Sequence, residues 1–176
     1  VTGVQTCALP ISLVLGDQDR VLRTLDGITF TTVESVNIDG SNGLAYGGGK
    51  FVAVSTTTAK NVRISQDNGL SWSIGTGRPG YGLNQVAYSP SLDLFCAVGD
   101  NGRIFTSPSG TLSWTARTSP TTANLDGVIW DGTAFRACGG TAYLSSTNGI
   151  SWTLTTIPLA PDGKGLGRIT YNTQSG

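Results

Sequence analysis

From Gln85 to Trp114 the chain reads QVAYSPSLDLFCAVGDNGRIFTSPSGTLSW, and this stretch decides the fold. It holds three short apolar runs, separated by groups rich in Gly, Asn, Asp and Pro, and it ends in a Ser-Trp pair. Nearly continuous apolar runs of this length suit strands that are buried on both faces. The residues at the joints suit tight turns, which need a positive or a fixed φ. The stretch therefore predicts consecutive short strands.

The same pattern recurs along the chain with a period of roughly 40 residues, a length typical of repeat proteins. The first apolar run of each copy ends in an aromatic residue, and a second aromatic residue follows the last turn of each copy. The first series is Tyr46, Tyr88, Trp130 and Tyr171, which are almost evenly spaced. The second series is Phe30, Trp72, Trp114 and Trp152, of which only the last interval is slightly shorter. Two independent landmarks with nearly one period indicate tandem repeats.

Each repeat holds four runs, which we label strands A to D. Strand A is expected over residues 43–46, 85–88, 127–130 and 167–171. One sheet of four short strands is too small to hide two apolar faces, whereas sheets stacked around an axis bury both. A sandwich would instead show clean apolar-polar alternation and no repeat of this length.

The sequence therefore predicts an all-β fold, a partial β-propeller of four-stranded antiparallel blades. Residues 14–24 match 98–107, so the native chain is expected to enter in the middle of a blade. The prediction is a half blade, three whole blades and one opening strand near Tyr171. Complete propellers have about 4 to 8 blades. We therefore expect the remaining blades, from missing parts of the protein, to cover the apolar faces of this piece.

Residues 65–72 read SQDNGLSW, which fits the pattern Ser-x-Asp-x-Gly-x-Ser/Thr-Trp. This stretch resembles the Asp-box, or BNR, repeat of sialidases, photosystem assembly factors, sortilin-type receptors and many bacterial and phage propellers. In such a turn the Ser and Asp side chains accept hydrogen bonds from backbone N–H groups, Gly supplies a positive φ, and Trp covers the turn. The role expected for these residues is structural.

The other turns match the box only in part. Residues 145–152 place Thr147 at the carboxylate position, residues 107–114 place Ser109 there, and residues 24–30 form a box one residue shorter. In the related families the boxes lie on the face away from the ligand. The expected box residues are Ser65, Asp67, Gly69, Trp72, Ser107, Trp114, Ser145, Gly149, Trp152, Asp26, Gly27 and Phe30.

The composition excludes several classes of function. Eleven basic and eleven acidic residues give a formal net charge of zero, which offers no electrostatic footprint for nucleic acid or for an anionic membrane. Histidine, the commonest general base and metal ligand, is absent. Residues 99–102 read GDNG and fit a hairpin turn better than a calcium loop. We expect no metal, no cofactor and no membrane span.

The first residues and the cysteines do not indicate where the protein is located. Residues 1–11 resemble the in-frame translation of a common sequencing adapter, and Ser12 could share a codon with its last base. A targeting segment is the competing interpretation, but the stretch has no initiator Met and no basic region. We therefore expect residues 1–12 to be an artefact and residues 13–176 to be one propeller fragment. Cys96 and Cys138 are expected to be small buried hydrophobes, so cysteine does not fix the compartment.

The resemblance to sialidases implies a test for catalysis. That family uses three arginines that clamp a carboxylate, a Tyr activated by a Glu, and an Asp acid/base. The single glutamate, Glu34, lies beyond a strand D, and Arg168 has Gly43, Gln85 and Gly127 as its repeat counterparts. No triad is visible, and no catalytic residue is predicted here, although the missing blades could carry a site.

Ligand binding is expected where the D-to-A loops and B-to-C turns share one face, opposite the boxes. The longest loop, residues 75–84, carries Arg78 and Tyr81, a pair suited to sugar or peptide recognition. Asn84 and Asp126 lead into strands A and could ring the tunnel mouth, or serve only as turn residues. The candidate ligand-binding residues are Arg78, Tyr81, Asn84, Asp126 and Arg168.

Three functions follow as hypotheses. The first is a non-catalytic binding or structural module with a glycan or protein ligand, in a secreted bacterial protein or a phage tail. The second is a fragment of a sialidase-like glycoside hydrolase. The third resembles a photosystem II assembly factor, although the double Gly that usually precedes the Trp in those repeats is absent. An extracellular or virion location fits the first.

Overall fold

The computed structural model describes residues 11–15, 20–33, 41–57, 62–75, 80–110, 113–158 and 165–171. These residues are strands and turns, apart from one short 3-10 segment, η2 (Asp100–Gly102). Within the described ranges, no helix has the length and apolar character needed to cross a membrane.

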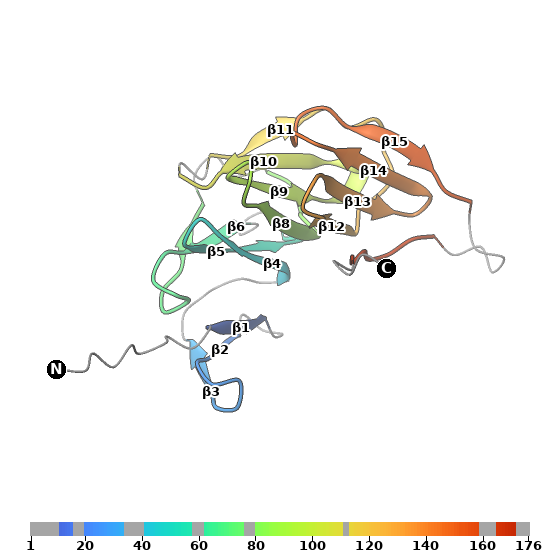
Figure 1. The fold of residues 1–176 in the computed structure, drawn as a ribbon. Coiled ribbons are helices and arrows are strands. Elements are labelled where there is room, and N and C mark those ends of the chain that lie inside the picture. The colour runs from blue at the N-terminus through green and yellow to red at the C-terminus, as the bar shows by residue number, and fades with distance from the viewer. Residues whose placement is uncertain are drawn as a thin grey trace, which may run out of the picture.

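The strands form four antiparallel sheets, which we call blades I to IV, and each sheet keeps its strands in chain order (Figure 1). Blade I holds β1 (Ser12–Leu15), β2 (Val21–Thr24) and β3 (Phe30–Val33). Blade II holds β4 (Ser41–Gly47), β5 (Lys50–Ser55), β6 (Val62–Ser65) and β7 (Ser73–Ile74). Blade III holds β8 (Gln85–Ser89), β9 (Leu94–Val98), β10 (Ile104–Pro108) and β11 (Thr115–Arg117). Blade IV holds β12 (Gly127–Trp130), β13 (Phe135–Gly139), β14 (Ala142–Ser146) and β15 (Thr153–Thr156).

This arrangement confirms an all-β partial propeller with three whole blades, and the expected half blade holds three of its four strands. Blade I contains strands B, C and D, because its β2-to-β3 turn holds the short box of residues 24–30. Cys96 and Cys138 are both buried and unbridged.

An aromatic pair across strands A and B recurs in every whole blade. The ring centroids are 4.6 Å apart for Tyr46 and Phe51 and 4.8 Å apart for Tyr88 and Phe95. In blade IV the ring centroids of Trp130 and Phe135 are 4.9 Å apart. Such pairs stabilise a sheet beyond the area that they bury, and they fix which residues face each other across the two strands. The partners lie directly opposite in the strand register, as for Tyr46.

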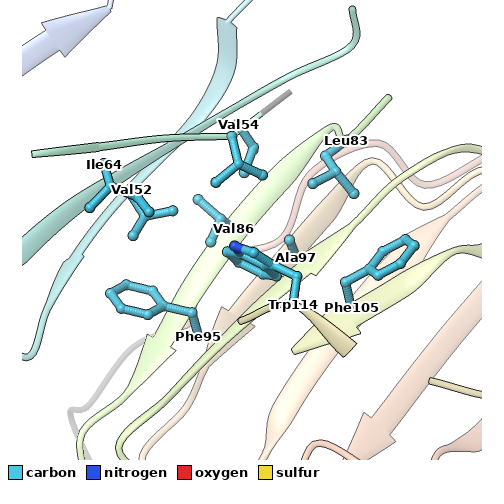
Figure 2. Close-up of a cluster of buried hydrophobic side chains, with 10 residues drawn as sticks. Val52, Val54, Ile64, Leu83, Val86, Phe95, Ala97, Phe105 and Trp114 are labelled. Atoms are coloured by element: carbon cyan, nitrogen blue, oxygen red, sulfur yellow. The ribbon is translucent and has the colours of Figure 1, made fainter. Parts of the chain in front are cut away.

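The core lies between blades rather than inside one. Phe95 and Ala97 of β9 belong to a cluster shared with blade II, which Figure 2 shows, whereas Cys96 and Val98 belong to a cluster shared with blade IV. Successive residues of a strand point to opposite faces, so one strand contributes to two interfaces. This is the stacking that two-faced apolar strands require.

Backbone hydrogen bonds also join blades III and IV to the blades before them. Leu83 N donates to Ser55 O at 2.8 Å, and Leu125 N donates to Gly99 O at 3.2 Å. Both leucines are fully buried. In blades III and IV this leucine lies two residues before strand A, and a single common apolar residue is too weak a signal to find from the sequence.

The predicted opening strand lies in the expected place but is not a strand. Leu166 makes an isolated antiparallel bridge to Gly140, and residues 167–171 join no ladder. The backbone of Arg168 lies so close to Gly127 that a Cβ added to Gly127 would be 3.2 Å from the Cα of Arg168. A strand needs a neighbour for its hydrogen bonds, and no described residue supplies a strand B beside this segment.

Candidate functional site

The two ends of the blades carry different kinds of connection. The A-to-B and C-to-D turns meet at one end, which we call the turn face, where Ser109 N donates to Asp93 O at 3.1 Å. The D-to-A loops and B-to-C turns meet at the other end, which we call the loop face. There the Asn84 side chain donates to Asp100 Oδ1 at 3.0 Å. The loop face therefore holds Tyr81 and Asn84, and the turn face holds the boxes.

Asn84 ties three parts of the loop face together. Its Nδ2 donates to Asp100 Oδ1 and also to the carbonyl of Leu125 at 3.1 Å, in the loop that leads to blade IV. A neighbouring bond joins Asn101 N to Asn124 Oδ1 at 3.0 Å. Both donor hydrogens of the Asn84 amide are thus engaged within the protein. Asn84 orders the loop face, and its amide oxygen can accept a hydrogen bond from a ligand.

Tyr81 and Arg103 form a stacked pair on the loop face. The Arg103 guanidinium carbon lies 3.5 Å from the Tyr81 ring centroid, and the Tyr81 side chain is 48% exposed. Tyr81 comes from the loop before β8, whereas Arg103 comes from the turn after β9. A cation over an aromatic ring is attractive, so the pair holds two connections in register. Arg78, the partner expected for Tyr81 from the sequence, lies outside the described residues.

Asp126 and Arg168 lie at the inner start of strand A. Burial raises the pKa of Asp126, the negative charge of Asp100 raises it further, and the positive charge of Arg168 opposes both. Burial and the Asp126 charge also raise the pKa of the Cys138 thiol. These groups are close enough to sense one another, and Arg168 is exposed. The charged groups near the start of strand A therefore come from blade III (Asp100), from the loop before blade IV (Asp126) and from the segment after blade IV (Arg168).

On the turn face, residues 65–72 form a turn in which side chains accept backbone hydrogen bonds. Ser65 Oγ donates to Asp67 Oδ1 at 2.8 Å and accepts from Gly69 N at 2.8 Å. Ser71 donates to the Asp67 carboxylate through both N, at 2.9 Å, and Oγ, at 2.5 Å. These bonds from Ser71 lower the pKa of Asp67 to about 2. The carboxylate is therefore a structural acceptor in this turn.

The turn of blade IV corrects the expected box alignment. The first hydroxyl belongs to Ser146, which accepts from Gly149 N at 2.9 Å, and not to Ser145. The carboxylate position belongs to Asn148, whose Oδ1 accepts from Ile150 N at 2.8 Å, rather than to Thr147. The reason is strand register, because Ser146 pairs with Phe135 and so faces the turn. Ser145 Oγ instead accepts from Arg136 Nη1 at 2.8 Å.

This shorter turn matches the turn of blade I residue by residue. Thr24 Oγ1 accepts from Gly27 N at 2.9 Å, and Asp26 Oδ1 accepts from Ile28 N at 2.8 Å. Hydrogen bonds from Thr29 and Ile28 hold the pKa of Asp26 well below its usual range. The amide oxygen of Asn148 in blade IV and the carboxylate oxygen of Asp26 in blade I thus accept equivalent backbone hydrogen bonds.

Blade III obtains its carboxylate from another turn. Ser109 Oγ donates to Asp93 Oδ1 at 2.6 Å, and Tyr88 donates its hydroxyl to the same oxygen at 2.5 Å. The bonds from Ser109 and Tyr88 lower the pKa of Asp93. Ser107 Oγ donates to the carbonyl of Pro108 at 3.4 Å. A motif search misses Asp93, because it lies in the A-to-B turn and two strands separate it from Ser109 in the chain.

The box aromatics pack between blades. Trp114 is 6% exposed in the cluster shared by blades II and III, and Trp72 and Trp152 pack against the clusters shared with the preceding blade. Phe30 of blade I is 47% exposed. The box aromatic therefore closes an inter-blade core, in addition to the turn-covering role expected from the sequence.

Comparison with known proteins places the fold. The chain is similar to a chain of the nidogen/laminin complex, with a TM-score of 0.68 and 12% identity, over 85% of this chain and 59% of that one. It is similar to YCF48 bound to D1 peptide, with a TM-score of 0.63 and 15% identity, over 87% and 54%. It is also similar to the GH74 xyloglucanase of Xanthomonas campestris, with a TM-score of 0.63 and 15% identity, over 86% and 28%.

These structures establish a partial propeller fold. The chain spans little more than half of the first two matched chains and less of the third. No family model and no curated protein matches the sequence. Among the described residues, no group of three His, Cys, Asp or Glu side chains is placed to hold a metal ion.

Proposed function

We propose that this chain is part of a non-catalytic propeller that acts as a binding or structural module and takes a glycan or protein ligand on its loop face. The observation that carries the proposal is the stacked pair of Tyr81 and Arg103 beside the amide of Asn84. The pair is half-exposed and is held by two separate connections, so it presents a preordered surface.

The chemistry of this surface suits a polar ligand with a flat or hydroxyl-rich face. Aromatic rings with a few fixed polar groups are what small-ligand sites use for orientation. Asn84 and Asp126 add an amide oxygen and a carboxylate near the start of strand A, and Arg168 adds an exposed guanidinium. Preordered groups bind at a lower entropic cost than groups that a ligand must order.

Two of the similar structures support a ligand of this kind. YCF48 is there bound to a D1 peptide, and the Xanthomonas enzyme is a xyloglucanase, so related folds accept a peptide or a carbohydrate. The box-like turns on the opposite face support membership of the Asp-box family, with a structural role for Ser65, Asp67 and their counterparts. A secreted bacterial or phage-tail protein, completed by further blades, is the setting that we propose.

The test is binding by the recovered full-length protein to a glycan array and to a peptide array. Tyr81→Ala should weaken any binding found at least tenfold, because it removes the aromatic face and frees Arg103. Leu70→Ala is the matched control, since Leu70 is 61% exposed on the opposite face. Equal loss in both variants, or none in Tyr81→Ala, would remove the loop face from the proposal.

A photosystem II assembly factor-like role is the second candidate, and the similarity to YCF48 favours it. Selective binding of a membrane-protein terminal peptide in the peptide array would support this role over glycan recognition. A sialidase-like hydrolase has less support, because the repeat position of Arg168 holds Gly43, Gln85 and Gly127 in the other blades. Hydrolysis of a fluorogenic sialoside by the full-length protein would overturn the non-catalytic proposal.

A further inference from the structure

A hollow of about 250 Å³ lies on the turn face, at the outer edge of blade I. Strand C, the box turn and strand D of that blade line it with Arg23, Leu25, Asp26, Thr29 and Thr31. Pockets for drug-sized ligands measure about 300–1,000 Å³, so this hollow has the size for one small ring. None of its lining residues belongs to the loop-face site, so it is a separate candidate.

The Arg23 side chain is fixed in the hollow by the neighbouring blade. Its Nε donates to the carbonyl of Asn68, in the box turn of blade II, at 2.9 Å. Thr31 lies directly opposite Arg23 in the register of β2 and β3, so both side chains lie on the same face of the sheet. Among the described residues, no carboxylate forms an ion pair with this guanidinium. Its terminal nitrogens can therefore donate to a ligand.

The other polar groups of the hollow can accept hydrogen bonds. Asp26 Oδ1 accepts from Ile28 N at 2.8 Å and from Thr29 N at 2.7 Å, and Asp26 Oδ2 takes no part in these two bonds. Thr31 Oγ1 donates to the carbonyl of Arg23 at 3.2 Å, which leaves its oxygen as an acceptor. The hollow thus combines a positive donor with negative and neutral acceptors.

The hollow belongs to a part of the blade that neighbouring blades do not cover. Blade II has a described neighbour on each side, so it shows which positions are buried in a stack. Its residues that match the box turn and strand D of the hollow are all exposed, namely Gln66, Ser71 and Ser73. The hollow would therefore stay open if a further blade preceded blade I.

An arginine is found at this position of strand C in blade I alone among the described blades. The other blades hold Ile64, Thr106 and Ser145 there. Ile64 is buried in the cluster shared by blades II and III. Thr106 and Ser145 accept hydrogen bonds from arginines of their own blades, at 2.7 Å and 2.8 Å. The donor that faces the hollow is therefore particular to blade I.

We propose that this hollow binds one uronic acid ring, a sugar that carries a carboxylate and several hydroxyl groups. The carboxylate accepts from the terminal nitrogens of Arg23, as guanidinium and carboxylate groups do in strong pairs. The ring hydroxyls donate to Asp26 Oδ2 and to Thr31 Oγ1, and Leu25 packs against the C–H face of the ring. A neutral sugar gives Arg23 no charged partner, and a simple anion is repelled by Asp26. This site does not depend on the function proposed for the loop face.

The first experiment titrates the full chain with galacturonate and follows the backbone amides by NMR. The amides of Ile28, Thr29 and Asn68 should shift together and saturate. Galactose and sulfate should bind about tenfold more weakly or less, because each lacks half of the matched groups. Trigalacturonate in a parallel titration distinguishes the end of a glycan chain from a free sugar. No shift at these amides with galacturonate, or equal affinity for galactose, would overturn the proposal.

Variants show whether Arg23 carries the binding. Arg23→Gln should weaken galacturonate binding about tenfold, because it removes a charged hydrogen-bond donor. Arg20→Gln is the matched control, since it removes an exposed charge at the other end of β2 and should leave the affinity unchanged. Tyr81→Ala should also leave it unchanged, which separates this site from the loop face. Equal losses in Arg23→Gln and Arg20→Gln would mean that only the net charge matters, and the proposal would fail.

Asp26→Asn keeps the test decisive if Arg23→Gln disturbs the fold. Asn148 fills the same place in the box turn of blade IV, so the amide is compatible with this turn. The variant removes the negative charge that repels simple anions, so acetate and sulfate should bind several-fold more tightly than they bind the parent chain. Unchanged binding of both anions would show that Asp26 does not face the ligand and would contradict the proposal.

Discussion

Blades I and III contain the same three strands B, C and D, yet they bury their side chains very differently. Ala97 and Trp114 of blade III are 0% and 6% exposed, whereas their register counterparts in blade I, Val14 and Phe30, are 45% and 47% exposed. Blade III has a neighbour on each face, and blade I has one neighbour among the described residues. The difference shows that a blade's own strands do not make its core, and that the adjacent blade does.

The largest expected effect separates the two box aromatics. Trp114→Ala should lower the free energy of unfolding by about 3–5 kcal/mol, because it leaves a cavity in the buried core between blades II and III. Phe30→Ala should cost less than about 1 kcal/mol, because that ring is half in solvent. Urea unfolding at a protein concentration where the chain is monomeric checks both values. Equal losses of stability in the two variants would contradict the contrast between blades I and III.

Much of this contrast could be predicted from the sequence, because the period and the two aromatic series place equivalent residues in each blade. What the sequence could not supply was contact across blades and turns. Two adjacent serines, Ser145 and Ser146, are equally good box residues until the register of β14 decides which one faces the turn. Asp93 serves the turn that holds Ser109, and that link exists only in three dimensions.

The loop face was predictable as a place and less so as a set of contacts. The sequence assigned Tyr81 and Asn84 to the same end of the blades as candidate ligand-binding residues, and that role stays a prediction. It did not pair Tyr81 with Arg103 or Asn84 with Asp100, because each pair joins a D-to-A loop to a B-to-C turn. Glu34 and Arg78 lie outside the described residues, so their roles stay predictions.

The second prediction compares two box glycines. Gly27 and Gly149 both have positive φ, at 74° and 71°, but a Cβ on Gly27 meets nothing within 4 Å, whereas one on Gly149 would lie 2.7 Å from Leu94 of blade III. Gly27→Ala should cost about 1–2 kcal/mol from the backbone alone. Gly149→Ala should cost roughly 1–3 kcal/mol more, because the Leu94 side chain of blade III must move away. Thermal and urea unfolding of the two variants gives the difference, which the account requires to be positive.

The third prediction tests whether a box needs a charge. Asp67→Ala should cost about 1 kcal/mol, because it leaves Ser71 N without its acceptor. Asp67→Asn should keep most of the stability at neutral pH, because Asn148 performs this role in blade IV. Urea unfolding at pH 7 measures both. A loss in Asp67→Asn as large as in Asp67→Ala would show that the charge itself is required.

The smallest expected effect is a pH dependence of stability that arises from the boxes with a carboxylate, such as that of Asp67. Hydrogen bonds from Ser71 lower the pKa of Asp67 in the folded protein from 3.8 to about 2. A carboxylate with a lowered folded pKa stabilises the fold above its unfolded pKa, and this stabilisation is lost as the pH falls from about 4 through about 2. Asp67→Asn should therefore show a shallower loss of stability across this window than the parent chain. Parallel curves of stability against pH for the variant and the parent chain would contradict the role assigned to the Asp67 carboxylate.

Hydrogen exchange of individual backbone amides tests most directly the claim that neighbouring blades make each core. The account predicts that the middle strand β2 of blade I exchanges orders of magnitude faster than β9 and β10 of blade III, although all three are hydrogen-bonded strands. Equal protection of β2 and β9 would mean that a blade is stable on its own strands, and the account would be wrong.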